Sequence, residues 1–76
     1  GGEDAPLPGK ARAVEVSQNE KVSKGQRLLT LEAMKMEHSL TAPFDGVVAE
    51  LPVQAGQQVA EGSLLARVEP ESAGEQ

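Results

Sequence analysis

The stretch Ala5-Pro6-Leu7-Pro8-Gly9 returns 37 residues later as Ala42-Pro43-Phe44-Asp45-Gly46. The similarity extends well beyond this motif, because eight of the 28 positions from 5 to 32 are identical to positions 42 to 69 without a gap. Self-similarity at a fixed spacing is typical of a fold assembled from repeated structural units. The repeat therefore predicts a domain made of two copies of one half.

Each copy begins with a short alternating run after its proline-containing motif. Val14 and Val16 alternate with polar residues in the first copy, and Leu51 and Val53 occupy the equivalent positions in the second. Alternation with a period of two is typical of a half-buried β-strand. We therefore expect a strand around each of these two pairs.

Each copy continues with a turn and a second strand. Polar, turn-forming stretches cover residues 19–25 and 56–62, and both end in glycine, which adopts positive φ without a steric penalty. Apolar strands are predicted next, over residues 27–33 and 64–69. No window has a sustained helical period, and five prolines argue against long helices. The pattern predicts an all-β domain, a compact flattened barrel in which two halves interlock around one core.

Composition excludes several classes of function. A chain of 76 residues forms one small domain, and with a net charge of −5 and one aromatic residue it offers no basic, stacking surface for nucleic acid. No apolar run is long enough to span a membrane, and no signal peptide is visible. The absence of cysteine fits a reducing compartment.

The seam between the two copies contains the sequence Glu32-Ala33-Met34-Lys35-Met36-Glu37-His38. Residues 27–33 and 36–41 both have strand patterns, so only Met34-Lys35 is left to connect them. A two-residue connection is the tightest hairpin loop, and its usual type I′ form needs positive φ at both positions. Met-Lys is a poor sequence for such a turn, which suggests that function selects it. Lys35 is then expected at the extreme tip, pointing into solvent.

The residues around Lys35 allow more than one interpretation. Lys35 alone could be an ordinary surface lysine, and methionine often fills gaps in a core. Both Met34 and Met36 cannot easily point inward from a two-residue turn, so we interpret them as neighbours of an exposed functional lysine. His38 shares a face with Met36 and Leu40, and we interpret it as a structural strand residue.

This motif, with the Ala-Pro-x-x-Gly sequences on either side of it, resembles the attachment motif of biotin carboxyl carrier (biotinyl) domains of biotin-dependent carboxylases. The resemblance covers residues 5 to 69. It implies a flattened β-barrel, a barrel-sandwich hybrid of two four-stranded antiparallel sheets with quasi-twofold symmetry. It also implies that biotin is covalently attached to Lys35. There is no room between Val16 and Val22 for the extra "thumb" of some acetyl-CoA carboxylase carriers, which favours the thumbless type.

The resemblance further implies a carrier without catalytic activity of its own and with no metal site. Biotin on Lys35 would shuttle a carboxyl group from a biotin carboxylase to a carboxyltransferase, with an acyl-CoA or pyruvate as acceptor. The parent would be a carbon–carbon bond-forming ligase, such as a methylcrotonyl-, propionyl- or geranyl-CoA carboxylase. A biotin protein ligase would be a further partner, and the location would be bacterial cytoplasm or mitochondrial matrix.

Flanking residues receive more limited roles under this resemblance. Glu32, Ala33 and Glu37 are candidates for recognition by the ligase or carboxylase, and the glutamates also keep the tip soluble. Residues 1–4 are expected to be a flexible tail or linker, residues 5–69 the biotinyl carrier domain, and residues 70–76 a flexible tail.

Two alternatives remain open from the sequence. A lipoyl carrier domain shares the fold and the lysine at a hairpin tip, but its lysine usually lies in an Asp-Lys-Ala setting. An unmodified barrel-sandwich adaptor would leave the symmetric placement of Met34 and Met36 about Lys35 unexplained.

Overall fold

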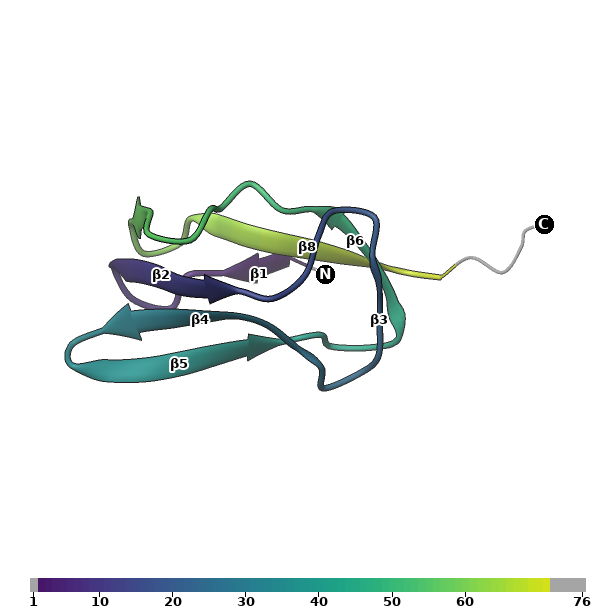
Figure 1. Ribbon diagram of the computed structural model, residues 1–76, viewed down its shortest axis with the longest axis horizontal. Helices are drawn as coiled ribbons and strands as arrows, with labels where there is room; N and C mark the ends of the chain where they lie inside the picture. Colours follow the sequence, from purple (N-terminus) through teal and green to yellow (C-terminus); the bar gives the residue numbers. More distant parts are fainter. Residues whose placement is uncertain (1, 72–76) are drawn as a thin grey trace.

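The computed structural model describes residues 2–71, and in this range it contains strands and turns but no helix. Eight strands form two four-stranded antiparallel sheets that face each other (Figure 1). The predicted all-β class is therefore confirmed. The strands are β1 (Gly2–Asp4), β2 (Gly9–Val14), β3 (Lys21–Val22), β4 (Arg27–Ala33), β5 (Met36–Thr41), β6 (Gly46–Glu50), β7 (Gln58–Val59) and β8 (Leu64–Pro70).

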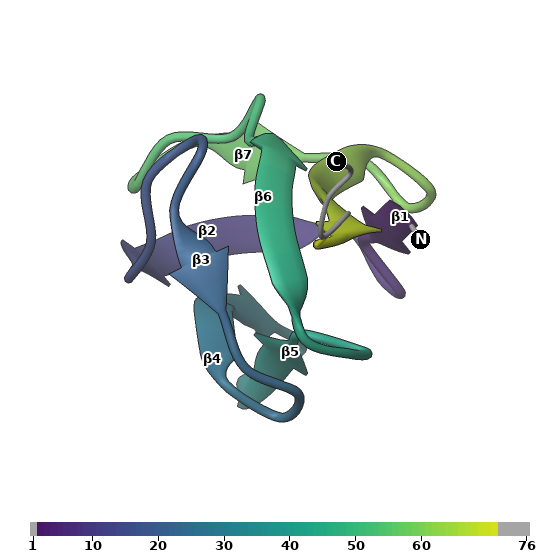
Figure 2. The same ribbon diagram turned by 90° about the vertical axis from the view of Figure 1, so that its right-hand side faces the viewer.

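The two repeat copies interlock by exchanging short strands. One sheet has the order β1-β8-β6-β3 and the other β5-β4-β2-β7. A shift of 37 residues places β2 on β6, β3 on β7 and β4 on β8, so each sheet contains one short strand from the other copy. Figure 2 shows β3 beside β6. The quasi-twofold arrangement expected from the repeat is present, and neither half forms a complete sheet alone.

Backbone hydrogen bonds repeat the same symmetry and explain the Ala-Pro motifs. The N–H of Ala5 donates to the carbonyl of Ser63 at 2.9 Å, and the N–H of Ala42 donates to the carbonyl of Gln26 at 2.9 Å. Both alanines are buried, with exposed fractions of 2%. Each motif is therefore hydrogen-bonded to the turn that precedes the long strand of the other sheet. The small, buried alanine side chain lets the two backbone segments lie close together.

The core lies between the sheets and is aliphatic. Burying one such side chain contributes roughly 1.5–3 kcal/mol relative to leaving it in water. The largest fully buried side chains come from β4, β6 and β8 and are Leu28, Leu29, Leu31, Leu65, Val48 and Val68. Half of them lie on β4, the strand that leads into the lysine turn, so this strand is the best anchored of its sheet.

Strand positions in the first part of each copy differ from the sequence-based expectation. The strand β2 ends at Val14 and β6 ends at Glu50, so Val16 and Val53 lie outside any strand although both are buried. Alternating burial does not require ladder hydrogen bonds, and these side chains enter the core from irregular segments. The stretches expected to be only turns also contain the two-residue strands β3 and β7.

The expected tail boundaries need correction as well. Gly2–Asp4, predicted to be a tail or linker, forms β1 and pairs with β8 from Gly2 opposite Arg67 to Asp4 opposite Leu64. Pro70, predicted to begin the second tail, is the last residue of β8 and lies opposite Gly46. Main-chain pairing depends little on side-chain identity, which is why residues 2–4 carry no strand pattern. Residue 1 and residues 72–76 of the expected tails lie outside the described residues.

Candidate functional site: the tip of the β4–β5 hairpin

The hairpin formed by β4 and β5 has the two-residue turn that the sequence predicts. Ala33 lies opposite Met36 in the register, which leaves only Met34 and Lys35 between the strands. Their φ angles are 53° and 65°, so both residues are in the left-handed region that a type I′ turn requires. For residues other than glycine this region costs roughly 1–2 kcal/mol each. The fold retains this strained backbone at the one place where Lys35 projects.

Lys35 is exposed. It belongs to the turn that joins β4 to β5, at one end of the barrel (Figure 1). Within residues 2–71 its amine has no hydrogen bond or ion pair, whereas the amine of Lys21 is 2.9 Å from a carboxylate oxygen of Glu71. Ala33, two residues earlier, is 3% exposed and belongs to the core. The amine of Lys35 is therefore exposed and has no partner among the described residues, and the strand that leads to it is anchored in the core.

The two methionines lie outside the core. Met34 is 77% exposed and Met36 is 63% exposed. The alternative in which they fill core gaps is excluded, and the interpretation of them as neighbours of an exposed lysine is confirmed for their position. Together with Lys35 they give the tip one cation between two apolar, flexible side chains.

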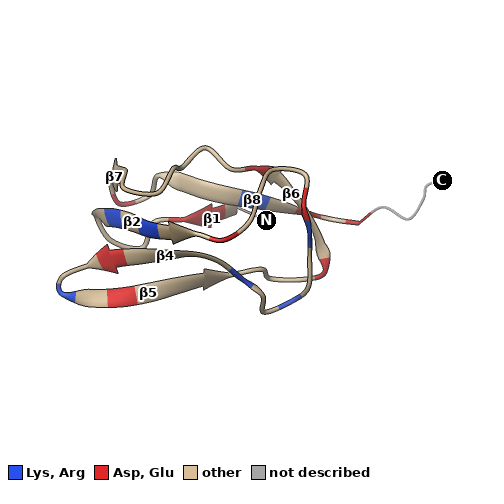
Figure 3. Ribbon diagram, viewed as in Figure 1, with Lys and Arg blue, Asp and Glu red and all other residues tan. Residues whose placement is uncertain are grey.

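Acidic residues flank the tip on the strands below it. Glu32 and Glu37 lie directly opposite each other in the register, an arrangement that is unfavourable for like charges. Arg12 on β2 approaches Glu32 at 3.4 Å, so one of the two charges is partly compensated. Figure 3 shows the lysine at the turn and the acidic segments on both strands. In the described part of the chain no ion pair is formed by Glu37, which leaves its carboxylate available to a partner.

His38 behaves as a strand residue, as predicted. It is half-buried on β5 opposite Leu31, and its Nε2 atom is buried without a hydrogen-bond partner among the described residues. No carboxylate is therefore oriented on that nitrogen, and the geometry of an acid–base pair is not found. Across residues 2–71 no group of acidic, histidine or cysteine side chains is arranged to hold a metal ion.

Gly9 supports the tip, although it was not among the residues predicted for the site. A Cβ atom on Gly9 would lie 2.4 Å from the carbonyl oxygen of Glu32 and 3.0 Å from the Cβ of Ala33. The first strand residue of β2 is therefore in close backbone contact with the last residues of β4. The repeated glycine at the end of each Ala-Pro-x-x-Gly motif was the available signal, because glycine often marks close backbone approach.

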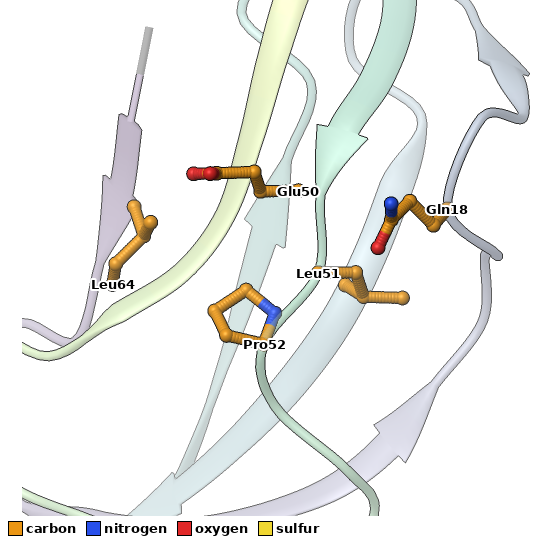
Figure 4. A pocket seen from close by; sticks show the side chains of 5 residues that line it. All are labelled: Gln18, Glu50, Leu51, Pro52 and Leu64. Atoms are coloured by element: carbon orange, nitrogen blue, oxygen red, sulfur yellow. The ribbon is translucent and has the colours of Figure 1, made fainter.

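A separate groove of about 550 Å³ lies on another part of the surface (Figure 4). Its lining comes from the loop after β2, from the end of β6 and the residues after it, and from the start of β8: Gln18, Glu50, Leu51, Pro52 and Leu64. None of these residues belongs to the β4–β5 hairpin, so the groove is not part of the lysine site. No helix within residues 2–71 has the length and hydropathy needed to cross a membrane.

Comparison with known proteins connects this geometry to a family. The model of the family described as "Biotin-requiring enzyme" matches residues 4–68. The alpha subunit of mitochondrial methylcrotonoyl-CoA carboxylase from Arabidopsis thaliana is 50% identical over 64 residues, which cover 84% of this chain and 9% of that subunit. The biotin carboxyl carrier protein of acetyl-CoA carboxylase from Solanum lycopersicum is 48% identical over 61 residues, covering 80% of this chain and 87% of that protein.

A solved structure extends the comparison to the fold. The lipoyl domain of the 2-oxoglutarate dehydrogenase complex from Azotobacter vinelandii superposes with a TM-score of 0.76 at 25% identity, covering 86% of this chain and 82% of that domain. The barrel architecture is thus common to biotinyl and lipoyl domains, whereas the much higher identities are to biotin carriers. The chain therefore belongs to the family of biotin-requiring enzymes, and within it to the biotin carboxyl carrier domains.

Proposed function

We propose that the amine of Lys35 is the atom to which biotin is joined. The observation that supports this most directly is the combination of exposure, a free amine and a strained two-residue turn at one position. In the attachment step the lysine ammonium first loses a proton to a base, and the neutral nitrogen then attacks the carbonyl carbon of an activated biotinyl group. An amide bond forms, the activating group leaves with the bonding electron pair, and the nitrogen gives up a second proton. The residues fit this reaction, because no side chain within residues 2–71 competes for the amine.

The carrier role follows from what the chain itself provides. Biotin, when bound, accepts and releases a carboxyl group, and the hard chemistry belongs to the cofactor and to separate active sites. The chain contributes a long, flexible lysine side chain on the rigid base formed by β4 and β5. Tethering raises the effective concentration at each site that the tip reaches. The strand β8 ends at the opposite end of the barrel from the turn (Figure 1), which leaves the tip unobstructed.

We infer that the chain acts with a biotin carboxylase and a carboxyltransferase, and that a biotin protein ligase loads it. The chain spans 9% of the methylcrotonoyl-CoA carboxylase subunit it matches. An acyl-CoA carboxylase of the thumbless type is the proposed parent. Residues 15–20 support this, because they connect β2 to β3 without an additional strand. Bacterial cytoplasm or mitochondrial matrix remains the predicted location.

Co-expression with a biotin protein ligase tests the attachment directly. Intact mass spectrometry should find one biotinyl group on the chain, and avidin should capture it. Lys35→Ala should lose both signals, whereas Lys24→Ala, which removes another exposed lysine, should retain them. Biotin found on Lys35→Ala, or a lipoyl group found in place of biotin on the unsubstituted chain, would contradict the proposal.

A further inference from the structure

The tip contains all the sulfur in the chain. The sequence has two methionines and no cysteine, and the two methionines are the residues on either side of Lys35. Their exposed fractions of 77% and 63% are large for apolar side chains. Among residues 2–71, Met34 and Met36 are the two large hydrophobic residues that are exposed. An exposed thioether is open to two-electron oxidants, whereas a buried one is protected by packing.

We propose that Met34 and Met36 form a paired oxidative modification site whose substrate is a peroxide such as hydrogen peroxide. A lone pair on each sulfur attacks one peroxide oxygen, the oxygen–oxygen bond breaks, and a sulfur–oxygen bond forms. The sulfur is oxidised by two electrons, and the second oxygen leaves as water after proton transfer. Two equivalents of peroxide therefore convert the pair to two sulfoxides and release two molecules of water. No other side chain in the sequence offers a sulfur atom that competes for the oxidant.

The barrel tolerates this modification because neither side chain contributes to the core. The buried side chains of β4 end at Ala33, which precedes the turn. A sulfoxide oxygen added to Met34 or Met36 stays in water, so no polar group is buried without a partner. Oxidation of a core methionine would instead disrupt packing. The modified domain is therefore expected to unfold at nearly the same temperature as the unmodified one.

Oxidation makes the surface of the tip more polar, although the fold is unchanged. Each oxidation turns a flexible apolar side chain into a polar hydrogen-bond acceptor, directly beside Lys35. A partner that covers the tip then has to desolvate two strong dipoles that were absent before. This consequence rests on the proposed function: oxidation makes the tip a poorer substrate for the ligase that joins biotin to Lys35. Because methionine sulfoxide is reducible by sulfoxide reductases, the change is reversible.

The test uses the unmodified chain, treated with hydrogen peroxide, beside Met34→Leu, Met36→Leu and the double leucine variant. Intact mass should rise by about 16 Da for each methionine present, that is, twice in the unsubstituted chain and not at all in the double variant. Peptide mapping should assign the oxygen to positions 34 and 36, and thermal unfolding should be nearly unchanged. Each chain is then given to a biotin protein ligase, and its biotinylation rate is divided by that of its own untreated sample.

Oxidation of the unsubstituted chain should lower this ratio several-fold, and treatment with methionine sulfoxide reductase should restore it. The ratio for the double leucine variant should remain one. A chain whose methionines resist peroxide while a short methionine peptide is oxidised would overturn the modification site, as would a clear loss of thermal stability. An oxidised chain that is biotinylated at the untreated rate would overturn the effect on the tip. The mass and unfolding measurements need no biotin, so failure of biotin attachment in the untreated chain would contradict the proposed function separately.

Discussion

Gly46 and Glu69 lie in backbone contact across the β6–β8 pair: a Cβ atom on Gly46 would be 2.1 Å from the carbonyl oxygen of Glu69. The repeat mates of these residues make the same contact in the other sheet, where a Cβ on Gly9 would be 2.4 Å from the carbonyl oxygen of Glu32. Each Ala-Pro-x-x-Gly motif therefore ends in a residue that lets a strand approach the end of its long neighbour. In one copy this contact supports the tip, and in the other it supports the opposite end of the barrel.

Replacing Gly46 with alanine should destabilise the domain strongly. Real Cβ atoms do not approach a backbone oxygen this closely, so β6 or β8 must move. We expect a loss of about 3 kcal/mol or more in the free energy of unfolding, at the upper end of over-packing effects. Gly25→Ala is the matched control, because its φ is +85° but no atom lies within 4 Å of the added Cβ. Urea denaturation should give a clearly smaller loss for Gly25→Ala, and equal losses would contradict the backbone contact.

Replacing Met34-Lys35 with a preferred turn sequence should stabilise the domain. Asn-Gly is the preferred sequence for a type I′ turn, so Met34→Asn/Lys35→Gly relieves two residues with φ of 53° and 65°. We expect a gain of about 1 kcal/mol, measured as a rise of roughly 4–8 °C in Tm for a domain of this size. Biotin attachment should be lost. A lower Tm in the double variant would mean that Met34 or Lys35 makes a stabilising contact that outweighs the strain.

Core and tip residues of the same hairpin should differ sharply in their effect on stability. Leu31 is fully buried, and Leu31→Ala should cost about 2–5 kcal/mol in the free energy of unfolding. Met36→Ala should change it by no more than about 0.5 kcal/mol, because this side chain is 63% exposed. Chemical denaturation of both variants measures the contrast. If Leu31→Ala is too unstable to purify, Leu31→Val should show a smaller loss in the same direction.

Replacing either methionine with leucine should affect carboxyl transfer more than biotin attachment. Met34→Leu and Met36→Leu keep an apolar side chain beside Lys35, so biotin attachment should be preserved. The thioether is more flexible than leucine, and its loss should slow carboxyl transfer once the tip is bound at an active site. Separate rates for attachment and for transfer by the parent carboxylase measure this. Equal transfer rates in the leucine variants and the unsubstituted chain would remove the methionines from the positioning of the tip.

The opposed carboxylates should influence recognition by the ligase. Glu32→Lys/Glu37→Lys reverses both charges at the base of the tip while keeping them exposed. If the ligase reads these charges, the attachment rate should fall several-fold, and the difference should shrink at high salt because exposed charges are screened. The double variant Glu15→Lys/Glu71→Lys makes the same change in net charge at two exposed carboxylates that follow β2 and β8 at the other end of the barrel, and it is the control. An unchanged rate in the double variant would leave the glutamates only a role in solubility.

Residues of the tip were predictable because their constraints are local. A two-residue gap between two strand patterns requires positive φ at Met34 and Lys35, and it leaves Lys35 no route into the core. The limits of β4 and β5 follow from the same patterns, and the structure gives them as Arg27–Ala33 and Met36–Thr41. The repeat also predicted that the halves interlock, although it did not identify which strands they exchange.

Other elements depend on partners far along the chain. The strand β1 exists because Gly2–Asp4 meets the free edge of β8, and its own residues carry no pattern that distinguishes it from a tail. Val16 and Val53 were predicted to lie in strands because they are part of an alternating hydrophobic pattern. They are buried but lie outside any strand, since such a pattern indicates burial and not hydrogen bonding. The pairing of Arg12 with Glu32 arises from the β2–β4 register.

The sequence by itself determined the twofold repeat, the all-β class and the exposed lysine at the seam, because periodicity and turn length act between neighbouring residues. Only the tertiary structure decided which strands cross between the sheets, which glycines support the tip and which charges meet beside it. Those features depend on backbone groups brought together across many residues, and the free energy of the whole packed barrel selects them.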